Sequence, residues 1–134
     1  MKRLLLLCAV ALYGADQEAL VRQVAAYEFG KDPTAVRELE KLTLRSGAAI
    51  EKLLLSGLAS ARTLAAKDAF CRDLAIAGGD AAVAKLAVML LDPDTAEMAR
   101  YALERIPNAS AASRLRDAAG RTSPPHRRTA RSGR

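Results

Sequence analysis

The sequence predicts an all-α protein in which pairs of antiparallel helices repeat along the chain. The first observation is composition. Of 134 residues, 51% are hydrophobic but only 4% are aromatic and none is Trp, so Leu, Ala, Val and Ile must fill the core. With Glu, Lys and Arg these residues favour helices, whereas strands prefer β-branched and aromatic residues. Turn signals at helical spacing and an internal repeat are the other two observations.

The first segment, residues 1–15, is typical of an export signal. Lys2 and Arg3 precede the apolar run LLLLCAVALY, and the small residues Gly14 and Ala15 follow it. Ten helical residues rise only about 15 Å, half the thickness of a bilayer core, which favours a cleaved signal peptide over a membrane span. The alternative is an apolar first helix that packs on the domain. We therefore expect an exported protein, periplasmic or secreted, cleaved after Gly14 or Ala15.

Residues 16–119 form the expected repeat domain, with about seven helices and no strand. Gly30, Gly47 and Gly78 follow three of the helical segments, and Pro107 follows another. Glycine and proline end helices in this position. The helices are expected at 16–29, 34–46, 48–59, 64–77, 81–90, 96–106 and 111–119.

Acidic residues stand where several of these helices should begin. Asp32 offers an N-cap, and Pro33 suits the first turn. Asp80 is the expected N-cap of the helix at 81–90. Asp94 and Glu97 have the spacing of a capping box at the start of the helix at 96–106.

Two neighbouring helices differ in their patterns. The helix at 81–90 is apolar almost all round, with Lys85 as its only charge, so it should have neighbours on both sides. Its main apolar stripe is Val83, Leu86, Ala87 and Leu90. The helix at 96–106 is amphipathic, with one apolar stripe of Ala99, Ala102, Leu103 and Ile106.

The alternation of these two helix types recurs in the chain. AAIEKLLL begins at position 48 and AAVAKLAV at position 81, 33 residues later, and a weaker match follows 29 residues further on. FCR at position 70 and MAR at position 98 are 28 residues apart. A two-helix unit of about 30 residues is typical of a helical solenoid, in which each unit buries its apolar face on the next.

The stretch AAKDAFCRDLAIAGGDAAVAKLAVMLLDPDTAEMARYALERIP resembles the HEAT-repeat family, most closely the short, Ala-rich bacterial variety often labelled PBS-lyase HEAT-like. The resemblance covers 65–119 well and 31–60 loosely. It implies a right-handed α-solenoid that offers an extended face to a partner protein, with no fixed catalytic residues. The chain is short for the family, and its Arg-rich end matches nothing in the repeat.

In each two-helix unit the second helix, at 64–77 and at 96–106, has one side that is a candidate binding surface. Interfaces favour exposed Tyr and Arg, and both occur there. The alternative is a solvated face with internal ion pairs, which the spacing of Asp68 and Arg72 favours. The expected partner-binding residues are Arg72, Glu97, Arg100, Tyr101 and Glu104.

Cys71 is expected to be a buried structural residue. Its alternative is a reactive thiol, or an attachment point for a bilin as the lyase-like resemblance suggests. No His lies nearby to activate it, since the single His is His126. The sequence offers no catalytic set, metal-ligand spacing or phosphate loop, so no cofactor, metal or small-molecule substrate is expected.

The net charge of +6 comes from the two ends of the chain. Residues 16–120 hold 14 basic and 15 acidic residues and are close to neutral. The tail, 120–134, is Arg-rich, contains two consecutive prolines and is expected to be disordered. It could bind nucleic acid through its charge, but it has no aromatic residue for stacking, and we expect no specific nucleic-acid partner.

These observations predict a non-catalytic, exported HEAT-repeat scaffold that binds another protein. The alternatives are a lyase-like accessory repeat protein that handles a prosthetic group, and nucleic-acid association through the basic tail. The helix at 111–119 has Leu115 as its only large apolar residue and covers its neighbours poorly. We therefore expect either a piece of a longer solenoid or an end that a partner completes.

Overall fold

A computed structural model describes the backbone of residues 2–122 and the side chains of residues 14–121. All regular structure in this part of the chain is helical, which confirms the predicted all-α class. The elements are α1 (Lys2–Ala25), α2 (Thr34–Ser46), the 3-10 helix η1 (Gly47–Ile50), α3 (Glu51–Ser60), α4 (Leu64–Ala77), α5 (Asp80–Met89), α6 (Ala96–Arg105) and α7 (Ala109–Thr122).

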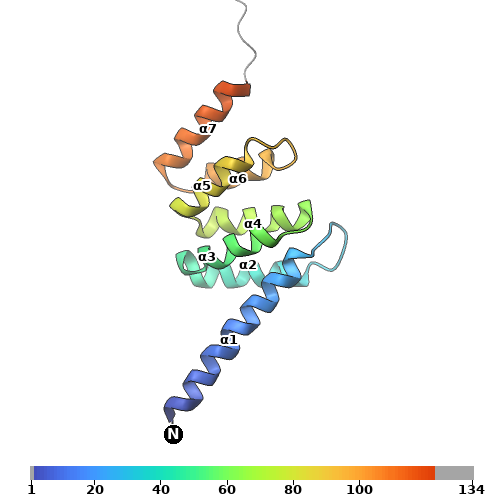
Figure 1. Cartoon of the computed structure of the whole chain (residues 1–134), viewed down its shortest axis with the longest axis vertical. Helices are drawn as coiled ribbons and strands as arrows, with labels where there is room; N and C mark the ends of the chain where they lie inside the picture. Colours follow the sequence, from blue (N-terminus) through green and yellow to red (C-terminus); the bar gives the residue numbers. More distant parts are fainter. Residues whose placement is uncertain (1, 123–134) are drawn as a thin grey trace, which may run out of the picture.

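The helices follow one another along the long axis of the molecule (Figure 1). Helix α4 lies at the centre and contacts α1, α2, α3 and α6. Helix α6 in turn contacts α5 and α7, and α5 also contacts α7. The N-terminal part of α1 extends away from the other helices (Figure 1).

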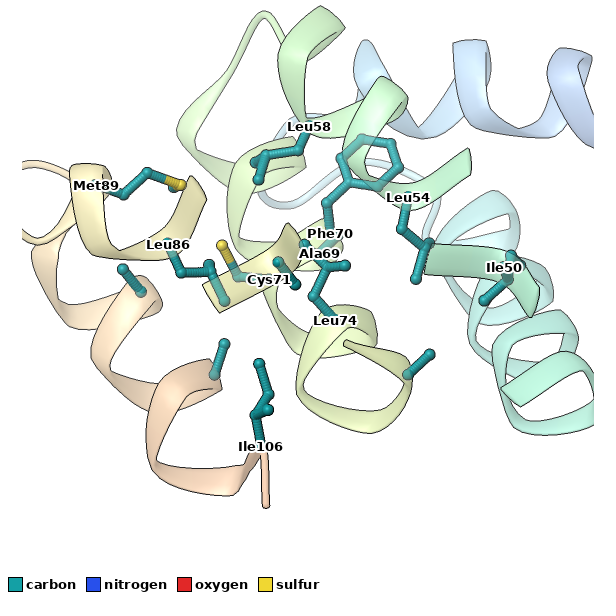
Figure 2. Close-up of a cluster of buried hydrophobic side chains, with 14 of the residues drawn as sticks. Ile50, Leu54, Leu58, Ala69, Phe70, Cys71, Leu74, Leu86, Met89 and Ile106 are labelled. Atoms are coloured by element: carbon teal, nitrogen blue, oxygen red, sulfur yellow. The ribbon is translucent and has the colours of Figure 1, made fainter. Parts of the chain in front are cut away.

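The core is centred on α4, because this helix has neighbours on several sides. Phe70, Cys71 and Leu74 are fully buried, and Ala77 is nearly so. Figure 2 shows the side chains of Leu54, Leu58 and Leu86 converging on this helix from α3 and α5. Phe70, Leu74 and Ala77 therefore form a buried stripe along α4.

Helix α1 runs without a break from Lys2 to Ala25, so the predicted end at Phe29 is wrong. The backbone N–H of Arg62 donates to the carbonyl of Ala25 over 3.0 Å. The Thr63 hydroxyl donates to the carbonyl of Tyr27 and also accepts from the N–H of Ala66, which caps α4. The loop between α3 and α4 thus binds the carbonyl of Ala25, the last residue of α1, and that of Tyr27 just beyond it.

The junction between α2 and α3 is tighter than the sequence indicates. Gly47 has φ +56°, a left-handed conformation that glycine adopts easily, and it ends α2 as expected. The next helix was expected to begin at Ala48 as an α-helix. It begins instead as the 3-10 helix η1, and α-helical geometry starts at Glu51.

The expected N-cap at Asp80 is wrong. Asp80 lies inside the first turn of α5, where its Oδ1 accepts a hydrogen bond of 2.6 Å from Nδ2 of Asn108. The free N–H of Ala82 in that turn donates to Oε1 of Glu51 over 3.3 Å. A carboxylate from α3 therefore caps α5, which sequence spacing cannot reveal.

The expected capping box of Asp94 and Glu97 is also wrong. Helix α6 has Thr95 at its N-cap without a side-chain cap bond, and the buried Thr95 hydroxyl donates to the carbonyl of Met89 over 2.8 Å. Glu97 pairs with Arg100 instead. At the start of α2 the predicted capping residue Asp32 does accept a hydrogen bond from the helix: the Thr34 N–H donates to its Oδ1 over 3.0 Å.

Helix α6 has the predicted apolar face, and α5 has its predicted apolar stripe. Ala99, Ala102 and Leu103 are buried as expected. On α5 Val83 and Leu86 are buried and Ala87 and Leu90 are partly buried, whereas Val88, outside the predicted stripe, is 63% exposed. Helix α5 contacts both α6 and α7, while its side at Val88 stays exposed.

Helix α7 extends to Thr122, beyond the expected end at Ala119. Arg121 lies in its last turn, where a cation interacts favourably with the helix dipole. The rest of the predicted tail, including His126, lies outside the described residues. Among the helices in residues 2–122, none is long and apolar enough to cross a membrane.

Candidate functional site

The five residues of the predicted binding surface lie together on one face. Arg72 is on α4, and the other four are on α6, which packs against α4. All five line a single open hollow of about 290 Å³. We call this surface the α4–α6 face; it is formed by Asp68, Arg72, Glu97, Met98, Arg100, Tyr101, Glu104 and Arg105.

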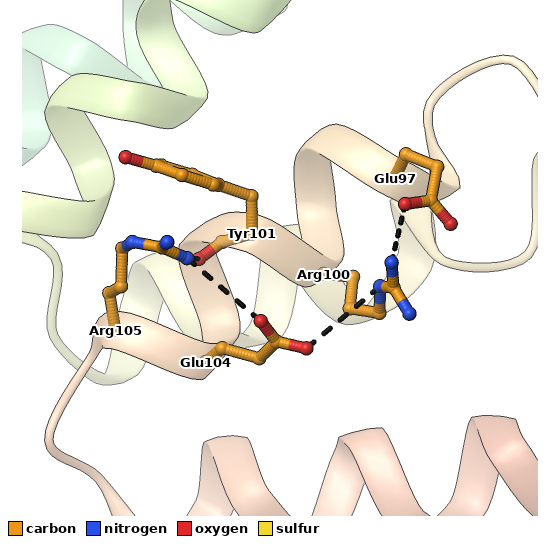
Figure 3. A network of polar contacts seen from close by, with 5 residues as sticks. All are labelled: Glu97, Arg100, Tyr101, Glu104 and Arg105. Carbon is orange, nitrogen blue, oxygen red and sulfur yellow. Dashed lines mark hydrogen bonds and ion pairs between the residues drawn. The ribbon is translucent and has the colours of Figure 1, made fainter.

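Ion pairs along α6 order the charged side chains of this face. Nη2 of Arg100 lies 2.6 Å from Oε2 of Glu97, and Nε of Arg100 lies 3.9 Å from Oε1 of Glu104 (Figure 3). These pairs have the three- and four-residue spacings that bring side chains together on a helix. All three side chains are about half exposed or more, so each pair contributes a few tenths of a kcal/mol.

Tyr101 is held by arginines from two helices. The guanidinium carbon of Arg105 lies 3.5 Å from the centre of the Tyr101 ring, and that of Arg72 lies 5.8 Å away. Nη1 of Arg105 also donates to the carbonyl of Tyr101 over 2.9 Å. Figure 3 shows the ring stacked on the Arg105 guanidinium. These cation–π contacts order a ring that is still 38% exposed.

Arg72 is tied to its own helix by the expected ion pair. Its Nε lies 3.0 Å from Oδ2 of Asp68, one turn earlier on α4. Two thirds of the Arg72 side chain remains exposed. The pair fixes the direction in which the Arg72 side chain leaves α4 and places its guanidinium near Tyr101.

Asp73 is a member of the site that our sequence interpretation missed. It is only 3% exposed, and its Oδ2 atom is buried with no hydrogen-bond partner. Asp73 lines a second hollow of about 250 Å³, which also has Glu40 from α2 and Tyr101 and Arg105 from α6 in its lining. The available signal was its position three residues after Phe70, on the apolar stripe of α4.

Burial changes the acidity of this carboxyl group. Loss of solvation raises the pKa of Asp73 to about 7, and the negative charge of Glu40 adds to the effect. Near neutral pH the carboxyl group of Asp73 is therefore partly protonated, whereas an exposed aspartate is ionised. A partner that supplies a positive charge would favour its ionised form.

Cys71 is fully buried, as predicted for a structural cysteine. Burial, with a smaller contribution from the charge of Asp68, raises the pKa of the Cys71 thiol to about 12. The thiol therefore stays protonated, and a protonated thiol is a poor nucleophile. Within the part of the chain that the structure describes, no group of three His, Cys, Asp or Glu side chains could hold a metal ion.

The arrangement can form directional contacts with another molecule. It offers an ordered aromatic ring, three arginines and three carboxylates on one exposed face, and a buried carboxyl group beside it. No family model, curated protein or solved structure matches this chain.

Proposed function

We propose that this protein is a non-catalytic scaffold that binds a partner protein through the α4–α6 face. The observation that carries the proposal is Tyr101. An exposed tyrosine ring fixed by Arg105 and Arg72 loses little conformational freedom when it is buried in a complex. Tyr and Arg are also the residues that contribute most to binding energy in interfaces.

We further propose that the helices form a HEAT-like, right-handed solenoid. The packing of α2 on α4 and of α4 on α6 supports it, because the second helices of successive repeats are then neighbours. The recurrence of AAIEKLLL at 48 and AAVAKLAV at 81 supports the same arrangement. In such a solenoid the α4–α6 face is part of an extended surface that can contact a partner over more than one repeat.

Export is the third part of the proposal. The order of basic, apolar and small residues in 1–15 favours removal of this segment after secretion. The partner would then be another exported protein or the exposed part of a membrane protein.

Site-specific photo-crosslinking tests the binding face. A benzophenone amino acid replaces Tyr101 in one variant and Val88 in a control variant. Val88 is 63% exposed on α5 and lines neither hollow of the α4–α6 side, so both probes are accessible on different faces. In the producing cells, the probe at 101 should give discrete adducts that the probe at 88 does not.

Competition distinguishes a specific adduct from a random collision. Excess unlabelled protein should suppress the adduct at 101. The same excess of an Arg72→Glu, Arg100→Glu double variant with unchanged helical content should suppress it much less, because the charges of the face are reversed. Equal adducts at 101 and 88, or equal suppression by both competitors, would contradict the proposal.

A further inference from the structure

The hollow beside Asp73 has the features of a binding site rather than of a packing gap. Its volume of about 250 Å³ far exceeds the roughly 10–15 Å³ that a hollow needs to hold one water. A carboxyl oxygen of Asp73 is buried in its lining with no hydrogen-bond partner. Native proteins rarely leave such an atom unpaired, because burying it without a partner costs about 1–3 kcal/mol or more.

Two carboxyl groups in the lining of this hollow can receive a cation. Asp73 and Glu40 are its two acidic residues, and they come from α4 and α2. Its two arginines are already engaged, since Arg72 pairs with Asp68 and Arg105 stacks on the Tyr101 ring. Neither arginine has a hydrogen bond or an ion pair with the buried oxygen of Asp73.

We infer that this hollow, the Asp73 cavity, binds an alkylammonium group, and that in the complex it receives a lysine side chain of the partner protein. The second clause rests on the function proposed above. The cavity lies next to the α4–α6 face, since both are lined by Arg72, Tyr101 and Arg105. A chain bound on that face can therefore reach the Asp73 carboxylate with a side chain.

The shape of the acceptor selects lysine over arginine. One buried oxygen without a partner matches the compact ammonium group, whereas a guanidinium fork needs two acceptor oxygens in one plane. Apolar walls suit the methylene groups of a lysine stem. These walls are formed by Val36, Ala69, Ala75 and Ile76.

Occupation of the cavity should be linked to proton release. An ammonium group beside Asp73 stabilises its ionised form and thereby lowers the raised pKa of its carboxyl group. The other charged or titratable groups in the cavity lining are Glu40 on α2, Arg72 on α4, and Tyr101 and Arg105 on α6. Asp68, the partner of Arg72, lies one turn earlier on α4.

The first experiment needs no partner. The full chain, ¹³C-labelled at aspartate carboxyl groups, is titrated with pH in the presence of n-butylammonium chloride, n-butanol or sodium chloride at the same concentration. Butylammonium should lower the Asp73 midpoint, and the neutral alcohol and the salt should not. The exposed Asp32 carboxyl group, whose pKa is lowered by its hydrogen bonds from Thr34, is the internal control in the same spectra and should be unaffected.

Variants sharpen this test. Asp73→Asn should weaken butylammonium binding by about tenfold or more, because a charged hydrogen bond is lost, while Asp32→Asn, outside both hollows, should leave it unchanged. If butylammonium does not shift the Asp73 midpoint, the inference is overturned. The inference is also overturned if Arg105→Gln raises the Asp73 midpoint sharply while butylammonium does not shift it. Arg105 would then already neutralise the carboxylate.

The second experiment uses the photo-crosslinking probe at 101 and separates the two proposals. Asp73→Asn, or added butylammonium, should reduce the adduct, and butanol should not. If the adduct forms and neither Asp73→Asn nor butylammonium reduces it, the lysine inference is overturned, while the proposed binding face still stands. Absence of any specific adduct overturns both the binding face and the lysine assignment, and the titration alone then decides whether the cavity binds ammonium.

Discussion

The backbone of Gly57 lies directly against the ring edge of Phe70. A Cβ atom placed on Gly57 would be 2.4 Å from Cε1 of Phe70 and 2.8 Å from a methyl carbon of Val21. Phe70 is fully buried and Val21 is nearly so, which leaves neither side chain room to move. This contact joins α1, α3 and α4 at one point and sets how closely α3 approaches α4.

Gly57→Ala is therefore expected to destabilise the protein by about 1–3 kcal/mol, although alanine is the better helix former. Gly120→Ala is the matched control, because Gly120 is also helical and a Cβ there meets nothing within 4 Å. The control should be neutral or stabilising by up to about 1 kcal/mol. Denaturant unfolding measures both. Similar effects at the two glycines would contradict the close contact.

Phe70→Ala should cost about 3–5 kcal/mol, because it empties a fully buried ring position in the core. Arg100→Ala, on the exposed face, should cost less than about 0.5 kcal/mol. Urea unfolding curves of both variants provide the measurement. In a Phe70→Ala background, Gly57→Ala should lose much of its cost, because the obstructing ring is gone. Equal losses for Phe70→Ala and Arg100→Ala would mean that the two helix faces are assigned wrongly.

Stability should depend on pH through Asp73. Its pKa is raised from 3.8 to about 7 in the folded protein, so the folded state holds this proton more tightly than the unfolded state. The contribution of Asp73 to the free energy of unfolding is fully present below about pH 4, declines as pH rises and is lost above about pH 7. This contribution is roughly 4 kcal/mol at most. Asp73→Asn should lack this decline, and unfolding curves of both proteins from about pH 4 to pH 8 measure it. Parallel pH profiles would rule it out.

Helix α7 should open before α5. Of the α7 side chains described, Ala111 is buried and Leu115 is partly buried, whereas α5 buries Ala82, Val83 and Leu86. Amides from 110–119 should therefore exchange with solvent about tenfold or more faster than those from 83–90. Hydrogen exchange of the isolated protein measures this difference. Equal protection of the two segments would show that α7 is anchored as firmly as the core.

Export predicts a shortened chain. The mass of the secreted or periplasmic protein should correspond to cleavage after Gly14 or Ala15, with a mature start near Asp16. Intact-mass spectrometry of the fractionated protein measures it. A full-length chain that retains Met1 and stays in the cytosol would contradict both the signal and the export.

Local sequence patterns determined much of the fold. The apolar stripe of Ala99, Ala102 and Leu103 is buried because a helical period places these residues on one side of α6. The same period places Glu97 and Arg100 within 2.6 Å of each other on the opposite side. Such features depend on residues only three or four positions apart, so the sequence contains all the information that they need.

The tertiary structure decided the features whose partners are distant in the chain. Helix α1 stops at Ala25 because a loop 36 residues further on binds the carbonyl of Tyr27, and α5 is capped by Glu51, 31 residues before Ala82. The site divides in the same way. The sequence identified Tyr101 and Arg72 as surface residues, but Asp73 gained its burial and its raised pKa only where α2 and α6 pack against α4. Solvent exclusion and the charge of Glu40 depend on that packing, and no local pattern specifies it.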